Sequence, residues 1–403
     1  MNTALKHWKE AATVILAAGT RRRPAFHSLK RSEIPSPPNF TKSDFAQNSV
    51  FDYEVLLLKR SGKSVFMPNI YVFPGGMVDP SDFSSDWLET FKSFRQSPNF
   101  GLGFVKQETR PPIFATDRQK LGSPITSDVA FRICAVRETF EESGILLVVP
   151  KNEENNIINT MNHSGDNQVT TPLTRLHELC GNRELARWRS LVIADPCNFI
   201  RMCRELDCMP NIWAMHEWGN WLTPKNDDYR RRYDTAFFIC CLQEIPPTVQ
   251  DEKEIVHFKW SSPSEVLQSY QTRELFVAPP QVYEMGRMCH FPQLQDLHSF
   301  ARMRAPEGCE RFLPVQLVAA DCSIYLLPGD ELYPENLDPS EDGGVNLSTE
   351  KSFEQLQEES SALHRFTRSY TINFHMSITP KHGHLRPIGA PSQTSSSTHK
   401  SRL

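Results

Sequence analysis

The stretch from Arg137 to Ile145 constrains this chain more than any other, because its residue types repeat with the period of a helix. At about 100° per residue, three glutamates fall within one narrow arc: Glu138, Glu141 and Glu142. Apolar residues fall on the opposite side of the same helix: Val129, Ile133, Val136 and Phe140. The pattern predicts a helix that buries one face and gathers three carboxylates on the other, with Gly144 as its C-cap.

These three carboxylates are candidate metal ligands. Like charges at this spacing repel one another unless a cation lies among them. Oxygen ligands without a neighbouring cysteine or histidine are typical of a Mg²⁺ or Mn²⁺ site. Arg137 lies just off the arc, where it can steer one carboxylate without taking a metal position. For the glutamates taken alone, an ordinary solvated acidic helix face is the alternative.

A glycine turn upstream, Phe73-Pro74-Gly75-Gly76, gives the acidic helix its context. Together the two pieces resemble the Nudix box, G-x5-E-x7-R-E-U-x-E-E-x-G-U, in which U is a bulky apolar residue. The matching residues are Gly76, Arg137, Glu138, Glu141, Glu142, Gly144 and Ile145. Asp82 stands where the family has Glu, Thr139 occupies an apolar slot, and a long insertion replaces the x7 spacer. A glycine loop and a helix can keep their places while such an insertion leaves and returns between them.

The resemblance implies a Nudix α/β/α sandwich with a mixed sheet, which belongs to the α/β class, and hydrolysis of a diphosphate linked to another moiety. It implies that Glu138 and Glu142 hold the Mg²⁺ or Mn²⁺ ion and that Glu141 shares metal or water contacts. Arg137 is then the fourth member of the catalytic group. The general base stays open between Glu138 and a carboxylate from a distant loop, Glu252 or Glu254.

The residues before the glycines bear on the substrate. Nudix enzymes that cleave coenzyme A carry the pattern L-L-T-x-R-[SA]-x3-R-x3-G-x3-F-P-G-G. In register with the F-P-G-G turn, this chain has matches at Leu56, Leu57, Arg60 and Ser61 and replacements at Leu58, Val65 and Asn69. For Arg60, the alternative to a phosphate ligand is an ordinary strand-end arginine in water.

The split box, the length of the chain, the strand that ends at Trp260 and the terminal tripeptide Ser401-Arg402-Leu403 together resemble the peroxisomal acyl-coenzyme A diphosphatases of the Nudix motif 19 type, up to about residue 335. The resemblance implies cleavage of coenzyme A and acyl-coenzyme A to adenosine 3′,5′-bisphosphate and 4′-phosphopantetheine or its acyl form. Arg60, Ser61, Gly75 and Gly76 would bind the substrate, the glycines by letting backbone amides approach its phosphates.

Two other functions remain as alternatives. A Nudix hydrolase of another diphosphate, such as NADH, ADP-ribose or capped RNA, would use the same helix with a different pocket. A Nudix-like binding module without catalysis is supported chiefly by Asp82. The complete set of helix carboxylates together with Arg137 argues against that second alternative.

Composition narrows the classes of partner. A net charge of −4 gives no reason to expect general nucleic-acid binding. The aromatic patch Trp213, Trp218 and Trp221 is interpreted as core rather than as a base-stacking platform. Ten cysteines without a Cys-x-x-Cys pair favour reduced core thiols over zinc or disulfides. No apolar run approaches the roughly 18 residues of a membrane span.

The chain is expected to contain a Nudix domain over 8–270, interrupted at about 83–126 by an insertion that passes over the catalytic face. A helical extension over 271–335 would pack on this domain. An acidic linker and a largely disordered tail would follow over 336–403, although weak apolar alternation at Tyr370–Met376 predicts that part of this region rejoins the body.

The two ends of the chain bear on localisation. Ser401-Arg402-Leu403 resembles the peroxisomal signal of the Ser-Lys-Leu type, which predicts a peroxisomal import receptor as a partner. The alternative is a mitochondrion, reached through a basic presequence around Arg21-Arg22-Arg23. Ala11–Ala18 is instead predicted to be the first strand, because β-branched residues centre it and Gly19 follows it.

Overall fold

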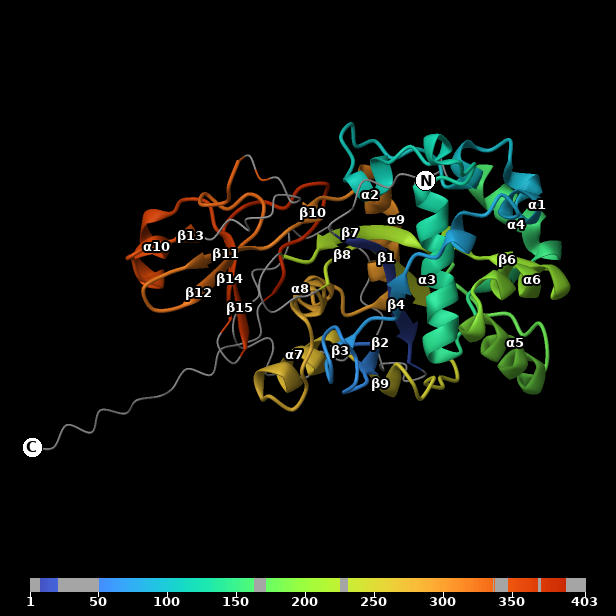
Figure 1. Ribbon diagram of the computed structural model, residues 1–403, viewed down its shortest axis with the longest axis horizontal. Coiled ribbons are helices and arrows are strands. Elements are labelled where there is room, and N and C mark those ends of the chain that lie inside the picture. Colours follow the sequence, from blue (N-terminus) through green and yellow to red (C-terminus); the bar gives the residue numbers. More distant parts are fainter. Residues whose placement is uncertain are drawn as a thin grey trace, which may run out of the picture.

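The computed structural model describes residues 8–20, 51–162, 172–224, 231–335, 337, 347–368 and 371–388. A larger body and a smaller C-terminal part, drawn in orange and red, lie side by side (Figure 1). The basic cluster Arg21–Arg23 and the terminal tripeptide Ser401–Leu403 lie outside the described residues. Within the described ranges, no helix is long and apolar enough to cross a membrane.

The larger body is built on a mixed sheet of eight strands, in the order β10-β7-β8-β1-β2-β3, with β4 paired to β1 and β9 paired to β2. Its strands are β1 (Lys9–Gly19), β2 (Tyr53–Arg60), β3 (Tyr71–Val72), β4 (Gly75–Met77), β7 (His216–Leu222), β8 (Tyr233–Leu242), β9 (Ile255–Ser261) and β10 (Arg311–Phe312). The predicted strand at Ala11–Ala18 is confirmed as the centre of β1. It is buried along its whole length, as expected of a strand covered on both faces.

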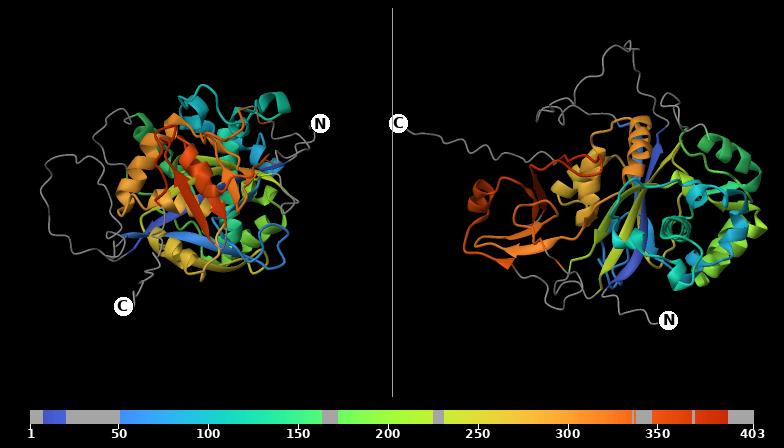
Figure 2. Two further views of the ribbon diagram at one scale, coloured as in Figure 1. Left: turned by 90° about the vertical axis from the view of Figure 1, so that its left-hand side faces the viewer. Right: turned by 90° about the horizontal axis from the view of Figure 1, so that it is seen from above.

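Helices cover both faces of this sheet, so the predicted α/β/α sandwich is confirmed (Figure 2). One face carries α3 (Ser127–Ser143), α5 (Asn182–Ala194) and α6 (Cys197–Glu205), and the other α7 (Pro263–Gln271), α8 (Pro279–Met288) and α9 (Leu294–Arg304). Alternate residues of β1 face the two layers. Val14 packs in the same core as Ile133 of α3, whereas Ile15 packs in the same core as Met285 of α8.

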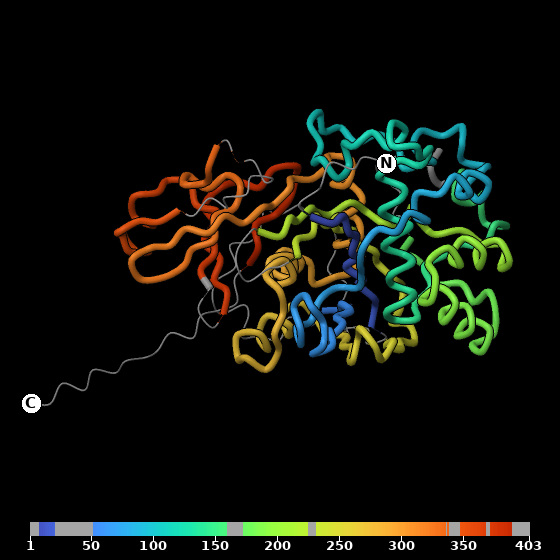
Figure 3. Tube along the Cα trace, in the orientation of Figure 1, coloured from blue at the N-terminus to red at the C-terminus, as the bar shows by residue number. Residues whose placement is uncertain are grey.

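The insertion over 83–126 is ordered and contributes to the core. It contains α1 (Trp87–Thr90) and α2 (Pro112–Ala115), and in Figure 3 it runs, in blue to cyan, towards the start of α3. Trp87, Phe91 and Phe94 are fully buried. Phe94 also packs on Trp213, with ring centroids 4.4 Å apart. The hydrophobic effect of these aromatic rings therefore anchors the insertion against the α3 side of the body.

The remaining short strands and helix of the body flank the helical layer that contains α3. They are β5 (Val148–Pro150), α4 (Glu154–Asn162) and β6 (Cys208–Pro210), and β5 pairs antiparallel with β6.

The C-terminal part differs from the sequence prediction. Residues 271–335 begin with helices, as predicted, but continue as strands, so the expected extension is helical only in its first half. The prediction of a largely disordered region is wrong for 347–368 and 371–388, which carry β-structure and one helix. A second sheet of five strands has the order β13-β11-β12-β14-β15. Its elements are β11 (Val315–Val318), β12 (Ser323–Leu326), β13 (Leu347–Ser348), α10 (Phe353–Glu359), β14 (His364–Arg368) and β15 (Ile372–Met376).

An ion pair and contacts to α8 hold this second sheet in place. Arg365 is fully buried and donates to both oxygens of Asp330, at 2.6 and 2.7 Å. On the side that faces α8, Tyr283 Oη lies 2.9 Å from His364 Nε2. The backbone N–H of Ile388 donates to Gly286 O at 2.9 Å, so the expectation of disorder from Pro380 onwards is also wrong as far as 388.

Candidate active site

The two halves of the predicted Nudix box meet in space, although the insertion separates them in sequence. Gly76 lies on β4 and Glu138 lies on α3, and a Cβ built on Gly76 would come within 2.4 Å of Glu138 Oε2. The Arg137 side chain donates to Met77 O at 3.1 Å. The glycine turn therefore lies directly beside the carboxylates, as the box requires.

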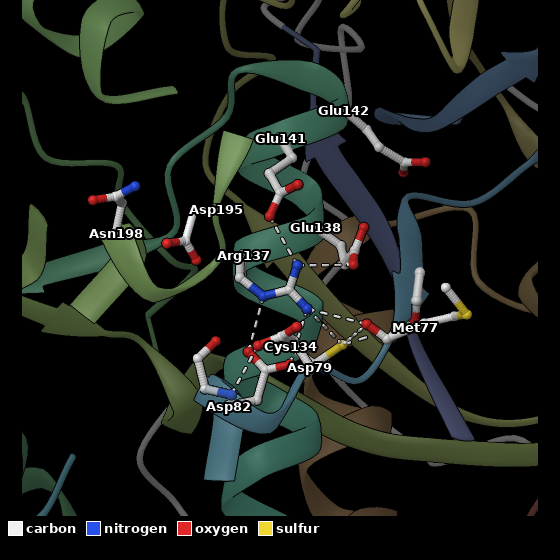
Figure 4. A network of polar contacts seen from close by, with 12 residues as sticks. Met77, Asp79, Asp82, Cys134, Arg137, Glu138, Glu141, Glu142, Asp195 and Asn198 are labelled. Carbon is white, nitrogen blue, oxygen red and sulfur yellow. Dashed lines mark hydrogen bonds and ion pairs between the residues drawn. The ribbon is translucent and has the colours of Figure 1, made fainter. Parts of the chain in front are cut away.

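Arg137 links the acidic groups of the site (Figure 4). It is only 2% exposed, and it donates through Nε and Nη2 to the two oxygens of Asp82, each at 2.9 Å. Its Nη1 donates to Glu138 Oε1 at 2.9 Å and to Glu141 Oε1 at 2.8 Å. The expectation that Arg137 steers one carboxylate was therefore too modest, because the guanidinium holds three.

Asp82, which departs from the family pattern, pairs with Arg137 in a fully buried position. The 3₁₀ turn Pro80–Phe83 places it there, since Asp82 Oδ2 accepts from the Asp79 N–H at 2.9 Å and Asp79 Oδ1 accepts from Ser81 at 2.8 Å. Such a bidentate arginine–carboxylate pair fixes the orientation of the guanidinium. Asp82 thus works as a positioning residue behind the carboxylates of α3.

The three glutamates of α3 lie in a partly desolvated environment. Burial raises the pKa of Glu138 to about 7, against the opposing effect of Arg137. Burial also raises the pKa of Glu141, and it raises the pKa of Glu142 well above the usual range, with the charge of Glu138 adding to the effect. In Figure 4 the carboxylates of Glu138 and Glu142 point to the same side of α3. Such a cluster favours a proton or a cation among its oxygens.

The donor set suits a divalent ion by its chemistry. Among the described residues, no three acidic, histidine or cysteine groups converge on one point. One oxygen of each glutamate is already engaged in a hydrogen bond. Arg137 donates to one oxygen of Glu138 and to one of Glu141, and the Gly75 N–H donates to Glu142 Oε2. Each glutamate keeps its second oxygen without a hydrogen bond from the described part of the chain. Hard oxygen ligands of this kind are those that Mg²⁺ and Mn²⁺ prefer.

Gly75 and Gly76 serve the site by lacking a Cβ. A Cβ on Gly75 would lie 2.3 Å from Ala12 O on the neighbouring strand, and the φ of Gly75 is +151°. A Cβ on Gly76 would meet the Glu138 carboxylate instead. The Gly75 N–H donates to Glu142 Oε2 at 2.9 Å, so this amide orients a carboxylate of α3.

A cavity of about 720 Å³ opens in front of these groups. Its wall includes seven of the eight residues predicted from the sequence: Arg60, Gly75, Gly76, Arg137, Glu138, Glu141 and Glu142. The exception is Ser61, whose Oγ accepts from Lys63 N–H at 3.3 Å and which does not line the cavity.

Arg60 enters the cavity wall without an acidic partner. Its guanidinium donates to Ser64 Oγ at 2.8 and 3.1 Å and to Phe66 O at 3.0 Å, and it makes no ion pair within the described ranges. A fixed arginine that lacks a carboxylate partner is suited to an anionic group of a ligand.

The cavity also contains residues that sequence reasoning missed or left open. Of the two loop carboxylates considered as a base, Glu254 lines the cavity and Glu252 does not. Trp221, interpreted only as core, is both buried and part of the wall. Further lining residues carried no motif that could have revealed them: Asp79, Asp251, Lys253, Gln281, Tyr325 and Phe366.

Comparison with known proteins agrees with this geometry. Residues 8–288 match the family model described as NUDT19 Nudix domain, and residues 316–377 match the NUDT19 C-terminal domain. A Xenopus laevis protein named "Acyl-coenzyme A diphosphatase NUDT19" is 44% identical over 398 residues, which are 98% of this chain and 99% of that protein. Proteins of the same name from Gallus gallus and Homo sapiens are 44% and 41% identical, and the matches cover 100% and 94% of both partners. The chain therefore belongs to the Nudix hydrolases, within the NUDT19 family.

Proposed function

We propose that this enzyme hydrolyses the diphosphate of coenzyme A and acyl-coenzyme A in the presence of Mg²⁺ or Mn²⁺. The products would be adenosine 3′,5′-bisphosphate and 4′-phosphopantetheine or its acyl form. The names of the three relatives support the substrate class. The observation that carries the proposal is that the carboxylates of α3, the glycine turn and Arg60 all line the same cavity.

A divalent ion held by Glu138, Glu142 and Glu141 would neutralise the phosphate charge and lower the pKa of a bound water. The chain's own residues do the positioning. Arg137 holds Glu138 and Glu141, and Asp82 fixes Arg137 from behind. Arg60 is placed to receive a phosphate oxygen, because it lines the same cavity and makes no ion pair among the described residues.

For the general base we choose Glu254 over Glu138. Both line the cavity, but Glu138 already accepts from Arg137 and belongs to the proposed metal set. Glu254 comes from the loop before β9, and its charge adds to the effect of burial, which is the main cause of the raised pKa of Glu141 and of Glu142. A carboxylate that faces the metal ligands from a separate element can take a proton from the attacking water.

A substrate panel tests the proposed function. Purified protein with Mg²⁺ is offered coenzyme A, an acyl-coenzyme A, NADH, ADP-ribose and capped RNA, and the products are identified by mass. We expect cleavage of both coenzyme A forms between the two phosphates. A clear preference for NADH, ADP-ribose or capped RNA would contradict the substrate assignment, and no cleavage of any member would contradict the enzyme assignment.

Two variants test the carboxylates in the same assay. Glu138→Gln and Glu142→Gln should each lower turnover by orders of magnitude, because the metal set loses a charge. Glu142→Gln should not lower the Tm, since burial already disfavours the charged form of that group. Glu184→Gln, on the exposed side of α5, is the matched control and should behave as the wild type. Near-normal turnover in both site variants would refute the metal assignment.

We also propose that the protein is located in peroxisomes and that an import receptor recognises Ser401, Arg402 and Leu403. A receptor of this type needs a basic residue followed by a terminal leucine, and the sequence supplies both.

A further inference from the structure

The cavity has an apolar end that the proposed chemistry does not use. Its wall there comes from three elements that lie far apart in the sequence: Trp221 at the end of β7, Pro280 in the first turn of α8, and Tyr325 and Phe366 in the second sheet. Tyr325 and Phe366 stack with ring centroids 4.9 Å apart and an interplanar angle of 9°. The C-terminal part therefore closes one end of the cavity with an aromatic wall.

The register of the main sheet gives the distance from the glycine turn to this wall. Gly76 pairs with Ala12, Ala12 pairs with Ala236, and Ala236 pairs with Asn220, which is followed by Trp221. Three steps between neighbouring strands at ~4.8 Å each span about 14 Å. Trp221, where the aromatic wall begins, lies at the far end of this row of paired residues.

That distance matches the arm that joins the diphosphate of coenzyme A to its sulfur. The pantetheine arm contains about twelve chain atoms, as many as about four extended residues, which is roughly 14 Å. With the phosphates beside Gly76 and the arm laid along this row, the sulfur would reach the neighbourhood of Trp221. An acyl chain on that sulfur would then continue onto Tyr325 and Phe366.

The part of the cavity wall beside β2 and β9 has a different chemistry. Arg60 and Lys253 line it on the β2 and β9 side of the glycine turn, where they lie on or beside those strands. Cations are suited to the additional phosphate of adenosine 3′,5′-bisphosphate, whereas an aromatic wall is suited to a hydrocarbon chain. These two parts of the wall would therefore orient the substrate, with its additional phosphate near the cations and its acyl chain near the aromatic wall.

Gln281 follows Pro280 of the apolar end directly in the chain. It lies in the first turn of α8, lines the cavity and is only 5% exposed. Its Oε1 is buried and has no hydrogen-bond partner among the described residues. A buried acceptor without a partner is costly to fold, so it indicates a donor that arrives with a ligand. The pantetheine arm carries two amide N–H groups and one hydroxyl that can serve.

We propose that the C-terminal part of this chain is the acyl-recognition element of the enzyme. In this proposal Tyr325 and Phe366 bind the acyl chain, and Gln281 Oε1 accepts a hydrogen bond from the pantetheine arm. The proposal rests on the proposed diphosphatase activity and adds the orientation of the substrate and the origin of its acyl selectivity. These three residues are specificity-determining and positioning residues, since none of them touches the reacting phosphorus.

Variants that reshape the aromatic wall test the acyl site. Phe366→Leu widens the wall and Tyr325→Trp narrows it, and kcat/KM is measured for free coenzyme A and for thioesters of 4, 8, 12 and 16 carbons. Each methylene buried against the wall should raise kcat/KM up to about fourfold in the wild type. We expect Phe366→Leu to shift the optimum to longer chains and Tyr325→Trp to shorter ones, with free coenzyme A changed less than about threefold.

Phe353→Leu is the control, because Phe353 lies on α10 of the same C-terminal part and is not in the cavity wall. It should leave the chain-length profile unchanged. An equal loss for free coenzyme A and all thioesters in the wall variants would place the adenine at this wall and overturn the proposal. Unchanged profiles in both wall variants would overturn it as well.

Gln281→Leu tests the hydrogen bond separately. The change removes the acceptor at nearly constant volume, so the Tm should stay the same or rise, while KM rises about tenfold for coenzyme A and all thioesters alike. A fall in Tm without a change in KM would show a structural role and overturn this part of the proposal.

The assay of the wild type distinguishes a failure of the proposed diphosphatase function from a failure of the acyl-site proposal. If the wild type does not cleave coenzyme A, the proposed function fails. If it does cleave coenzyme A but the wall and Gln281 variants keep its chain-length profile and its KM, only the further inference fails.

Discussion

Adding one methyl group at each of the two neighbouring glycines should separate the stability of the site from its chemistry. In Gly76→Ala, the new Cβ would lie 2.4 Å from Glu138 Oε2 and 2.5 Å from its Cδ. Both atoms belong to the end of a flexible side chain, so Glu138 can move away by about 1 Å at a cost of ~1 kcal/mol for its rotamer. That movement breaks the 2.9 Å contact with Arg137 and should lower kcat at least ~100-fold.

In Gly75→Ala, by contrast, the new Cβ meets backbone. It would lie 2.3 Å from Ala12 O and 2.6 Å from Thr13 Cα, atoms of β1 that cannot turn aside. The strands β1 and β4 must separate, and the residue must also hold a φ that side chains disfavour, which together cost roughly 1–3 kcal/mol or more. We expect a clear fall in Tm for Gly75→Ala and a small one for Gly76→Ala.

The measurement is a thermal unfolding curve together with the coenzyme A diphosphatase rate for each variant. Gly181→Ala is the control, because a Cβ there meets nothing within 4 Å and its backbone is not left-handed. It should retain wild-type turnover. Full activity in Gly76→Ala, or a loss of Tm as large as that of Gly75→Ala, would refute the geometric argument.

Three further predictions concern other parts of the molecule. Glu254→Gln should lower kcat about 100-fold or more, whereas Glu252→Gln should not, and equal rates would exclude Glu254 as the base. Burial lowers the pKa of His364 to about 4, below its value in the unfolded chain. The unfolded chain therefore binds a proton before the folded protein does, and the free energy of unfolding should fall by up to ~3 kcal/mol between about pH 6.5 and pH 4. His364→Asn should flatten this part of the pH–stability curve, and an unchanged slope would contradict the argument. Deleting Ser401–Leu403 should move the protein from peroxisomes to the cytosol at unchanged activity, and continued import would disprove the role of the tripeptide.

The local chemistry of the site could be predicted from the sequence because it is encoded at helical spacing. Glu138, Glu141 and Glu142 share a helix, so their order in the chain determines their arrangement. The glycine turn was recognisable for a similar reason, since it is one short motif. The pairing of Asp82 with Arg137 could not be predicted in this way, because an insertion separates the two residues and no periodic pattern in the sequence relates them.

Apart from the alternation noted at Tyr370–Met376, where β15 lies, the C-terminal part escaped prediction for a physical reason. Its strands are two to five residues long and lie between polar segments, so each one offers too little alternation to be distinguished from a loop. Their stability comes from pairing with one another and from the buried Arg365–Asp330 pair, both of which are long-range in sequence. The aromatic end of the cavity was hidden for the same reason.

The pairing of β1 with β8 has a consequence for how the chain must be made. Residues 9–18 pair in parallel with 233–242, so one edge of the buried strand β1 has no partner until residues roughly 220 positions later have been made. At about 5–20 residues per second, ribosomal synthesis needs on the order of 10 to 45 seconds to supply it. During that interval an unpaired strand of this composition is a template for aggregation. Nascent chains that end before residue 233 should therefore depend on chaperones far more than the finished protein does.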